Sequence, residues 1–404
     1  MYYDVILVGG GAAGFFTAIN IAERKPGLRI AIVERGKEVL SKVKISGGGR
    51  CNVTHACFVP SELVQFYPRG AKELLGPFHQ FCCGDTIAWF EKHGVELKIE
   101  EDGRMFPTTD SSQTIIDCFT QATAKHKIEV IQGVSVQGVY QSEKGWKLDT
   151  TKDSMTCAQL VFATGSNPKI GQLMGDLGHR LVEPVPSLFT FNIKDKRIQD
   201  LMGVSTEASI KVKGTKLEAT GPLLITHWGM SGPGILRLSA WGAQILAEKK
   251  YQFHIIVNWL PTVDREDLLE QLKDFKREHA KKMVMKRGLF DFPTRLWERF
   301  VQAAQIEATQ TWADVNNKQL QALMLQLQEG EFQVNGKSTF KEEFVTAGGI
   351  DLRDVNFKTM ESKVKADLYF AGEILNIDAI TGGFNFQNAW TTGFLAAQAI
   401  ASKF

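Results

Sequence analysis

The feature that most constrains the fold of this chain is a glycine-rich turn close to its amino terminus. Residues Asp4 to Val8 form a short apolar run, residues 9–14 read GGGAAG, and the helix-like segment FFTAINIAERK follows directly. A strand, a GxGxxG turn and a helix in this order are typical of the phosphate-binding part of a dinucleotide fold. The sequence therefore predicts a doubly wound α/β unit at the amino terminus.

Five residues of this turn have an expected structural or binding role. Gly9 permits the tight turn, Gly11 lets the backbone approach a pyrophosphate, and Gly14 lets the helix pack close to the strand. Ala12 and Ala13 lie at the start of the helix, where free N–H groups face an anion. We expect these five residues to bind the cofactor.

A carboxylate stands at the position where a ribose-binding acid is expected. A second apolar strand, Leu28 to Val33, ends in Glu34, which follows Gly14 by 20 residues. Strand, turn, helix, strand and acid in this order make a dinucleotide site a specific prediction. The motif alone leaves the dinucleotide open, because NAD and FAD share it.

Length, composition and charge exclude several classes of protein. The chain has 404 residues, 44% of them hydrophobic and 23% charged, as expected of a globular protein with more than one domain. Its 47 basic and 45 acidic residues nearly balance, so the overall charge favours neither nucleic acid nor membrane. The amino terminus lacks the features of a secretory signal, and no long apolar run is present. We expect a cytoplasmic protein that does not bind membranes.

A second glycine-rich stretch, KVKISGGGRCNVTH, follows the predicted second strand. We expect residues 42–46 to be a strand or loop, and Gly47 to Gly49 to gather backbone N–H groups into an anion-binding concavity with positive charge beside it. Cys51, His55 and Cys57 do not have the spacing of a zinc knuckle, and we predict no metal site. No base is evident for Cys51, so a small buried thiol is the simpler interpretation.

The stretch SGGGRCNVT and five later blocks, in the same order, resemble the bacterial flavoprotein family that includes BaiN-like reductases and aminoacetone oxidases. The blocks are RMFPTTDSSQTIIDCF (104–119), LVFATGSNPKIG (160–171), THWGMSGPGIL (226–236), VTAGGIDLRDVNFKTMES (345–362) and YFAGEILNIDAITGGFNFQNAWTTG (369–393). The resemblance spans most of the chain and implies FAD as the cofactor. The chain departs from the family pattern at His55, Asn376 and Phe384, where the family often has Asn, Asp and Tyr.

The resemblance and the turns together give a set of expected FAD-binding residues. Besides the residues of the first turn, they are Glu34, Arg35, Lys42, Gly49, Arg50, Cys51, Val134, Ala163, Thr164, Gly165, Gly372, Glu373, Asn376, Gly383, Phe384 and Asn385. The final helix is expected to begin near residues 382–385, so that its positive end would stabilise negative charge on a reduced flavin ring.

The cofactor domain is predicted to be discontinuous, because its first strand begins near residue 4 and a partner strand lies at Leu368 to Phe370. We expect an FAD-binding domain at 1–186 and 342–404. Between them, short alternating apolar runs predict an inserted β domain at 187–261, and a charged, helix-patterned region predicts a helical subdomain at 262–341.

The expected activity is hydride transfer between FAD and a second substrate. Family members are linked to oxidation of small amines, reduction of conjugated double bonds and reduction of uridine in ribosomal RNA, and a non-catalytic redox sensor is a further alternative. Residues 276–288, KREHAKKMVMKRG, carry six basic residues against one Glu, which favours RNA or is simply a solvated face. Cys51 and His227 are candidate acids. With no second GxGxxG turn, NAD(P)H is expected only as a transient reductant, and the sequence does not predict an oligomeric state.

Overall fold

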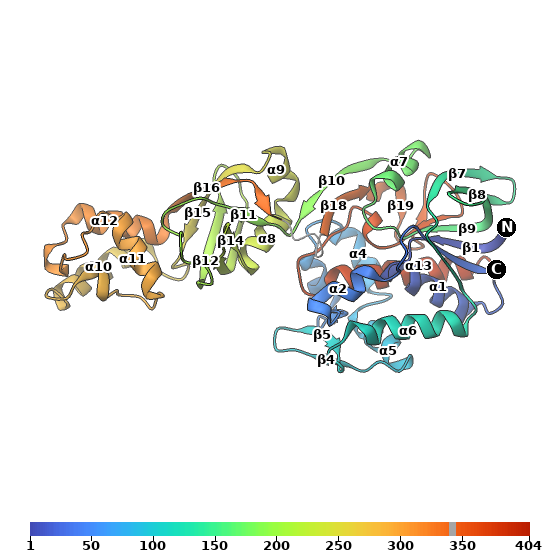
Figure 1. Ribbon diagram of the computed structural model, residues 1–404, viewed down its shortest axis with the longest axis horizontal. Coiled ribbons are helices and arrows are strands. Elements are labelled where there is room, and N and C mark those ends of the chain that lie inside the picture. Colours follow the sequence, from blue (N-terminus) through green and yellow to red (C-terminus); the bar gives the residue numbers. More distant parts are fainter. Residues whose placement is uncertain (339–344) are drawn as a thin grey trace. The chain divides into compact units, whose positions relative to one another are not determined.

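The computed structural model describes residues 1–338 and 345–404, which form two compact units, each with its own apolar core (Figure 1). Unit 1 comprises residues 1–185 and 341–404, and unit 2 comprises residues 186–340. The predicted boundary after residue 186 differs by one residue from the division at 185. The predicted boundary after residue 341 lies outside the described residues.

Unit 1 is built on a nine-stranded sheet within the described residues, in the order β19-β20-β21-β9-β1-β2-β6, with β7 paired to β8 and β8 to β9. Its strands are β1 (Tyr2–Val8), β2 (Ile30–Glu34), β6 (Glu129–Gln132), β7 (Val136–Ser142), β8 (Gly145–Thr150), β9 (Met155–Phe162), β19 (Val355–Asn356), β20 (Glu361–Ser362) and β21 (Leu368–Phe370). Smaller sheets hold β3 (Thr54–His55), β4 (Leu97–Ile99) and β5 (Arg104–Pro107), and β10 (Leu181–Ser187) with β18 (Val345–Ile350).

The centre of the main sheet is parallel. β21, β9, β1, β2 and β6 pair in parallel register, with Val8 opposite Val33 on one side and Phe162 on the other. A parallel strand covered on both faces needs a continuous apolar sequence, and the apolar runs of β1 and β9 supply it. The carboxyl ends of these strands meet at one edge, which is where ligands bind in open α/β sheets.

Helices complete unit 1. They are α1 (Ala12–Arg24), α2 (Ser41–Gly49), α3 (Pro60–Leu63), α4 (Ala71–Phe78), α5 (Cys83–Lys92), α6 (Ser112–Lys125), α7 (Pro168–Asp176) and α13 (Phe384–Ala401). α1 and α13 run side by side although they come from opposite ends of the chain (Figure 1). Gly393 allows this close approach, because a Cβ there would lie 2.7 Å from Thr17 Oγ1. The discontinuous unit is thus held together by its first and last helices.

The expectation of a strand or loop at residues 42–46 is wrong. These residues lie in α2, whose helical part ends at Ser46, where ψ is 148°. Gly47, Gly48 and Gly49 then follow with φ of 58°, 67° and 84°. Such a run of left-handed residues is accessible to glycine at little cost, so the glycines end the helix instead of extending a strand.

Unit 2 combines a seven-stranded sheet, counted over the described residues, with helices. Its strands are β11 (Thr190–Asn192), β12 (Ser205–Val212), β13 (Glu218–Ile225), β14 (Gly229–Ser231), β15 (Gln252–Asn258), β16 (Gly330–Asn335) and β17 (Lys337–Ser338). Its helices are α8 (Pro233–Trp241), α9 (Ala243–Glu248), α10 (Arg265–Glu278), α11 (Thr294–Ala303) and α12 (Asn317–Gln328). The last three lie together at one end of the sheet (Figure 1).

Two expectations for the insert need correction. The helical region does not reach residue 341, because Gly330–Asn335 form β16, whose strictly alternating burial marks a strand paired with β15. The region 187–261 is also not purely β, since Pro233 opens α8 at its first turn. Sheet and helices share one apolar core, in which Trp259 lies against Phe300. The inserted β domain and its helical subdomain therefore form a single unit.

Within residues 1–338 and 345–404, no helix is both long enough and apolar enough to cross a membrane.

Candidate functional site

The amino-terminal turn has the geometry that a bound pyrophosphate requires. Gly9 has φ of 115°, and a Cβ there would lie 2.4 Å from the carbonyl oxygen of Ala163. A Cβ on Gly14 would lie 2.0 Å from the Gly9 oxygen, whereas one on Gly11 would meet no atom within 4 Å. Gly9 and Gly14 are therefore required by the fold, and Gly11 faces open space. No side chain caps the amino end of α1, so the N–H groups at Ala12 and Ala13 retain the capacity to bind an anion.

Glu34 lies at the carboxyl end of β2, directly beside the glycine turn. Its Oε2 accepts from the Gly10 N–H at 2.7 Å and its Oε1 accepts from the Gly36 N–H at 2.7 Å. Each carboxylate oxygen keeps a further lone pair that a ribose hydroxyl can use. The N–H of Val134 donates to the Glu34 carbonyl at 3.0 Å, and the Arg35 side chain next to it is exposed. Three predicted residues thus gather at this strand end.

The Ala-Thr-Gly turn after β9 meets the turn after β21. Gly165 has φ of 63°, and its Cβ position is 3.6 Å from Glu373 Oε2. Glu373 also accepts from Lys42 Nζ at 2.6 Å. Gly372 has φ of 73°, and its Cβ position is 3.0 Å from the Cβ of Ala13. The residues predicted from four separate segments therefore converge on the amino end of α1. Thr164, between Ala163 and Gly165, is half-buried at the same turn.

The anion-binding concavity expected at the three glycines at the end of α2 stays a prediction, and the cations around these glycines are paired with carboxylates. Gly48 and Gly49 are exposed, and a Cβ on either would meet no atom within 4 Å. Arg50 donates to Glu100 at 2.6 Å and covers the Phe106 ring at 3.9 Å, while Lys42 is paired with Glu373. The positive charge expected beside this loop is present, but the carboxylates of Glu373 and Glu100, distant in sequence, pair with Lys42 and Arg50.

The loop before α13 joins the same region through Asn52 and Thr54. Gly383 has φ of 91°, and its Cβ position is 2.5 Å from the Thr54 oxygen and 2.9 Å from Asn52 Oδ1. The side chain of Asn385 contacts the loop itself, because its Oδ1 accepts from the Ala379 N–H at 2.9 Å and its Nδ2 donates to the Ala379 oxygen at 3.1 Å, and its role in cofactor binding stays a prediction. Asn385 therefore fixes the loop.

Asn376 has a comparable structural contact. Its Oδ1 accepts from the Gly348 N–H at 3.1 Å, and its own N–H donates to the Ile350 oxygen at 3.0 Å. It thereby ties the segment after β21 to β18. A role of Asn376 in cofactor binding stays a prediction.

An aromatic cluster at the amino end of α13 was not predicted. Phe384 stacks on Phe66 with ring centroids 4.3 Å apart and lies 4.5 Å from the His55 ring. His55 Nδ1 lies 3.0 Å from the Gly382 oxygen, so this nitrogen carries the proton of a neutral ring. Burial lowers the pKa of His55, which favours that neutral form. The sequence shows a His and a Phe at these positions, but only the fold brings them together.

The two candidate acids lie in very different surroundings. Cys51 is fully buried, and burial raises the pKa of its thiol to about 12, which disfavours proton transfer at neutral pH. His227 is exposed in the turn between β13 and β14 of unit 2. Both roles stay hypotheses. Across the described parts of the chain, no group of three or more His, Cys, Asp or Glu side chains is arranged to hold a metal ion.

The sequence from residue 3 to residue 399 matches the family described as HI0933-like protein Rossmann domain. The chain belongs to this family. It is 31% identical to the ribosomal RNA dihydrouridine synthase of Escherichia coli over 99% of both chains. It is 26% identical to the 3-dehydro-bile acid delta(4,6)-reductase of Clostridium scindens over 98% of both chains. As a member of this family, the protein is an oxidoreductase with an FAD-binding Rossmann domain. The match confirms the family and the fold class that we expected from the sequence.

Solved structures show the same fold at low identity. The 3-ketosteroid-delta4-(5alpha)-dehydrogenase of Rhodococcus jostii aligns with a TM-score of 0.53 at 12% identity, covering 99% of this chain and 97% of that one. The FrdA subunit of E. coli quinol fumarate reductase aligns with a TM-score of 0.51 at 13% identity, covering all of this chain and 70% of that one.

The residues present fit FAD. The open space at Gly11 suits the pyrophosphate, and Glu34 at the strand end suits the ribose. Gly48 and Gly49 are exposed and leave open space where a Cβ would stand, so their backbone is accessible to a ligand.

Proposed function

We propose that this protein uses reduced FAD to convert uridine in ribosomal RNA to dihydrouridine. The observation that carries the proposal is the alignment with the E. coli relative over 99% of both chains, because it includes unit 2 as well as the glycine turn. A second relative with the same name, from Haemophilus influenzae, is 27% identical over the whole of this chain.

Bound reduced FAD would supply a hydride to one carbon of the uracil C5=C6 bond, and the neighbouring carbon would take a proton from an acid or water. The chain's own residues would hold the cofactor and exclude water. Gly9 to Gly14 and Glu34 would bind its phosphates and ribose, and the positive end of α13 would stabilise negative charge on the ring. NAD(P)H is proposed as a transient reductant that docks at the flavin face.

A second candidate is reduction of a conjugated double bond in a small molecule. It is favoured by the similarity to the Clostridium scindens reductase over 98% of both chains. The hydride chemistry would be the same, and only the substrate differs. Oxidation of a small amine is a third candidate, which would release hydrogen peroxide when oxygen reoxidises the flavin.

The test compares dihydrouridine in digested ribosomal RNA from cells with and without the gene, by mass spectrometry. We expect dihydrouridine to be lost in the deletion strain and restored by the wild-type gene. A Gly14→Ala gene, which should fail to form the glycine turn, is the control and should not restore it. Unchanged dihydrouridine in the deletion strain would refute the proposal and direct attention to small conjugated substrates.

A further inference from the structure

A basic cavity lies in unit 2, outside the cofactor cradle. It has a volume of about 580 Å³ and is lined by His279, Lys281, Lys282, Met283, Lys286 and Arg287. These residues follow the end of α10 and include the short helical turn Val284–Lys286. The cavity therefore coincides with the basic segment noted in the sequence.

Buried tryptophans hold the backbone of this segment in place. Trp297 Nε1 donates to the Val284 oxygen at 2.8 Å, and Trp312 Nε1 donates to the Arg287 oxygen at 2.9 Å. Val284 and Met285 are buried, whereas the basic side chains on both sides of them are exposed. The segment thus presents cations from a fixed backbone, which lowers the entropy lost when they bind a ligand.

Most of this charge is uncompensated. Lys286 is 3.4 Å from Glu298, but within the described residues Lys281, Lys282 and Arg287 make no side-chain hydrogen bond or ion pair. Three clustered cations without carboxylate partners favour an anionic ligand. This differs from the glycine loop of unit 1, where each basic side chain that flanks the loop is paired.

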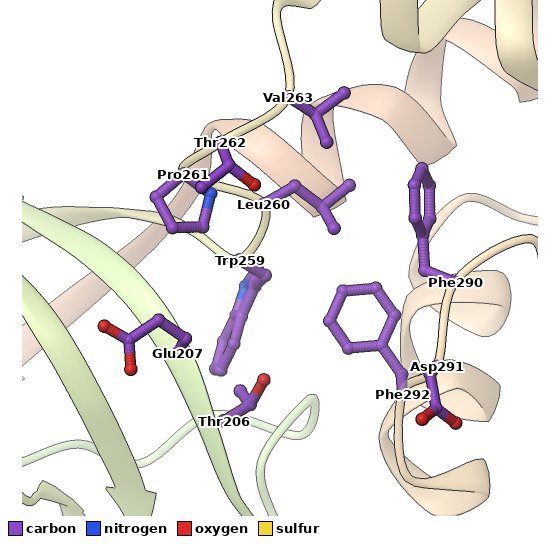
Figure 2. A pocket seen from close by; sticks show the side chains of 10 residues that line it. All are labelled: Thr206, Glu207, Trp259, Leu260, Pro261, Thr262, Val263, Phe290, Asp291 and Phe292. Atoms are coloured by element: carbon purple, nitrogen blue, oxygen red, sulfur yellow. The ribbon is translucent and has the colours of Figure 1, made fainter.

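A second cavity, of about 310 Å³, is lined by Phe290, Asp291 and Phe292, which follow the basic segment, and by residues 206–207 and 259–263. Figure 2 shows the Phe292 ring extending toward Trp259 and Leu260, with the Phe290 ring on the same side and the Asp291 carboxylate turned away. Phe290 and Phe292 are half-buried. Phe290 is three positions after Arg287 in the chain, so their Cα atoms are at most about 11 Å apart. Three stacked nucleotides of one strand span about 10 Å.

We propose that these two cavities form one docking surface for single-stranded RNA, with phosphates on Lys281, Lys282 and Arg287 and a base against Phe290 and Phe292. A basic groove beside aromatic rings is the combination by which proteins bind single strands. An anionic membrane would use the cations but not the neighbouring ring-lined cavity. The inference rests on the proposed function, since it names the surface that holds the RNA substrate.

The test uses the full-length holoprotein and a fluorescent single-stranded oligouridylate, titrated at several salt concentrations. The triple variant Lys281→Gln/Lys282→Gln/Arg287→Gln is expected to bind RNA more weakly than the wild type. The slope of its log affinity against log salt concentration should be less negative by about 2. Phe290→Leu keeps an apolar side chain but loses the ring, so it should weaken binding about fivefold or more without changing that slope.

The matched control replaces three other exposed lysines of unit 2 that have no ion pair among the described residues. These are Lys211, Lys216 and Lys249, each changed to Gln. The control should bind RNA like the wild type, and all variants should retain their FAD absorbance. Equal weakening by the control triple variant would overturn the inference, since general charge would then explain the binding. Wild-type binding that is no tighter to RNA than to dextran sulfate or phosphatidylglycerol vesicles would overturn it too.

The outcome is separable from that of the proposed function. If the deletion strain keeps its dihydrouridine but the binding variants behave as expected, the docking surface stands and the uridine reaction fails. If dihydrouridine depends on the gene but the Lys281→Gln/Lys282→Gln/Arg287→Gln protein binds RNA as tightly as the wild type, the reaction stands and the docking surface is wrong.

Discussion

Gly11 and Gly14 form a matched pair with which the role of the amino-terminal turn can be measured. In Gly14→Ala the new methyl group would lie 2.0 Å from the Gly9 oxygen. Overpacking of this kind lowers the free energy of unfolding by about 1–3 kcal/mol or more. In Gly11→Ala the methyl group meets no atom within 4 Å, and φ at this position is −95°, which alanine adopts freely.

The expected effect of Gly11→Ala on the apoprotein is small. Replacing glycine by alanine lowers the conformational entropy of the unfolded chain, which stabilises the fold by about 0.4–1 kcal/mol. Alanine is a poorer N-cap for α1 than glycine, which destabilises the fold by a similar amount. The net change in unfolding free energy is within about 1 kcal/mol of zero, or less than about 4 °C in Tm for a unit of this size.

The affinity for FAD should also distinguish the two variants. The Gly11→Ala methyl group fills the space that the pyrophosphate would enter. Crowding that costs about 1–3 kcal/mol would weaken FAD binding about 5- to 150-fold. The assay compares the thermal unfolding of both apoproteins with their affinity for FAD, measured by quenching of flavin fluorescence. A Gly11→Ala protein that is stable and binds FAD as tightly as the wild type would refute the placement of the pyrophosphate at this turn.

Three further changes test other parts of unit 1. Hydrogen bonds from His93 and, to a lesser extent, Lys92 lower the pKa of Glu23 from its ordinary value of 4.5 to about 2. The ionised carboxylate therefore stabilises the fold above pH 4.5, and this stabilisation is lost as the pH falls toward 2. Glu23→Gln should remove that part of the pH dependence in urea unfolding, and an unchanged profile would contradict it. Arg69→Ala leaves the fully buried Asp378 carboxylate without its guanidinium partner and should lower the free energy of unfolding by about 3–5 kcal/mol, measured with denaturant. A decrease much smaller than about 1 kcal/mol would contradict this expectation. The Cys51→Ala protein should retain FAD and most of its turnover, because the buried thiol is a weak acid. If the FAD-loaded variant had no activity, Cys51 would be the proton donor after all.

Local sequence was sufficient for the parts of the site that depend on short-range sterics. The tight contacts at Gly9 and Gly14 follow from a strand and a helix joined by one turn, and the carboxylate of Glu34 reaches that turn because it ends the adjacent parallel strand. The strand at Leu368–Phe370 was also evident from its apolar run.

Contacts between distant segments were beyond such reasoning. Lys42 was expected to add positive charge beside the glycine loop, but nothing in its local sequence pointed to its partner Glu373, which is 331 residues away. α2 was missed because three consecutive glycines suppress any helical pattern just where the helix ends. β16 was assigned to the helical region because it follows α12 with only one intervening residue, Glu329, and the alternation of six residues is short.

The pairing of α1 with α13 has a consequence for biosynthesis. Residues 1–185 leave the ribosome without the segment that supplies β21 and α13, which belong to the same sheet and core. At about 5–20 residues per second, roughly 10–40 s pass between the synthesis of residue 185 and that of the last residues of α13. During that interval unit 2, whose residues are contiguous, is free to fold first. Assembly of unit 1 is therefore a late event, and until α13 is made the apolar strands of the amino-terminal segment lack part of their core and are open to association with other chains.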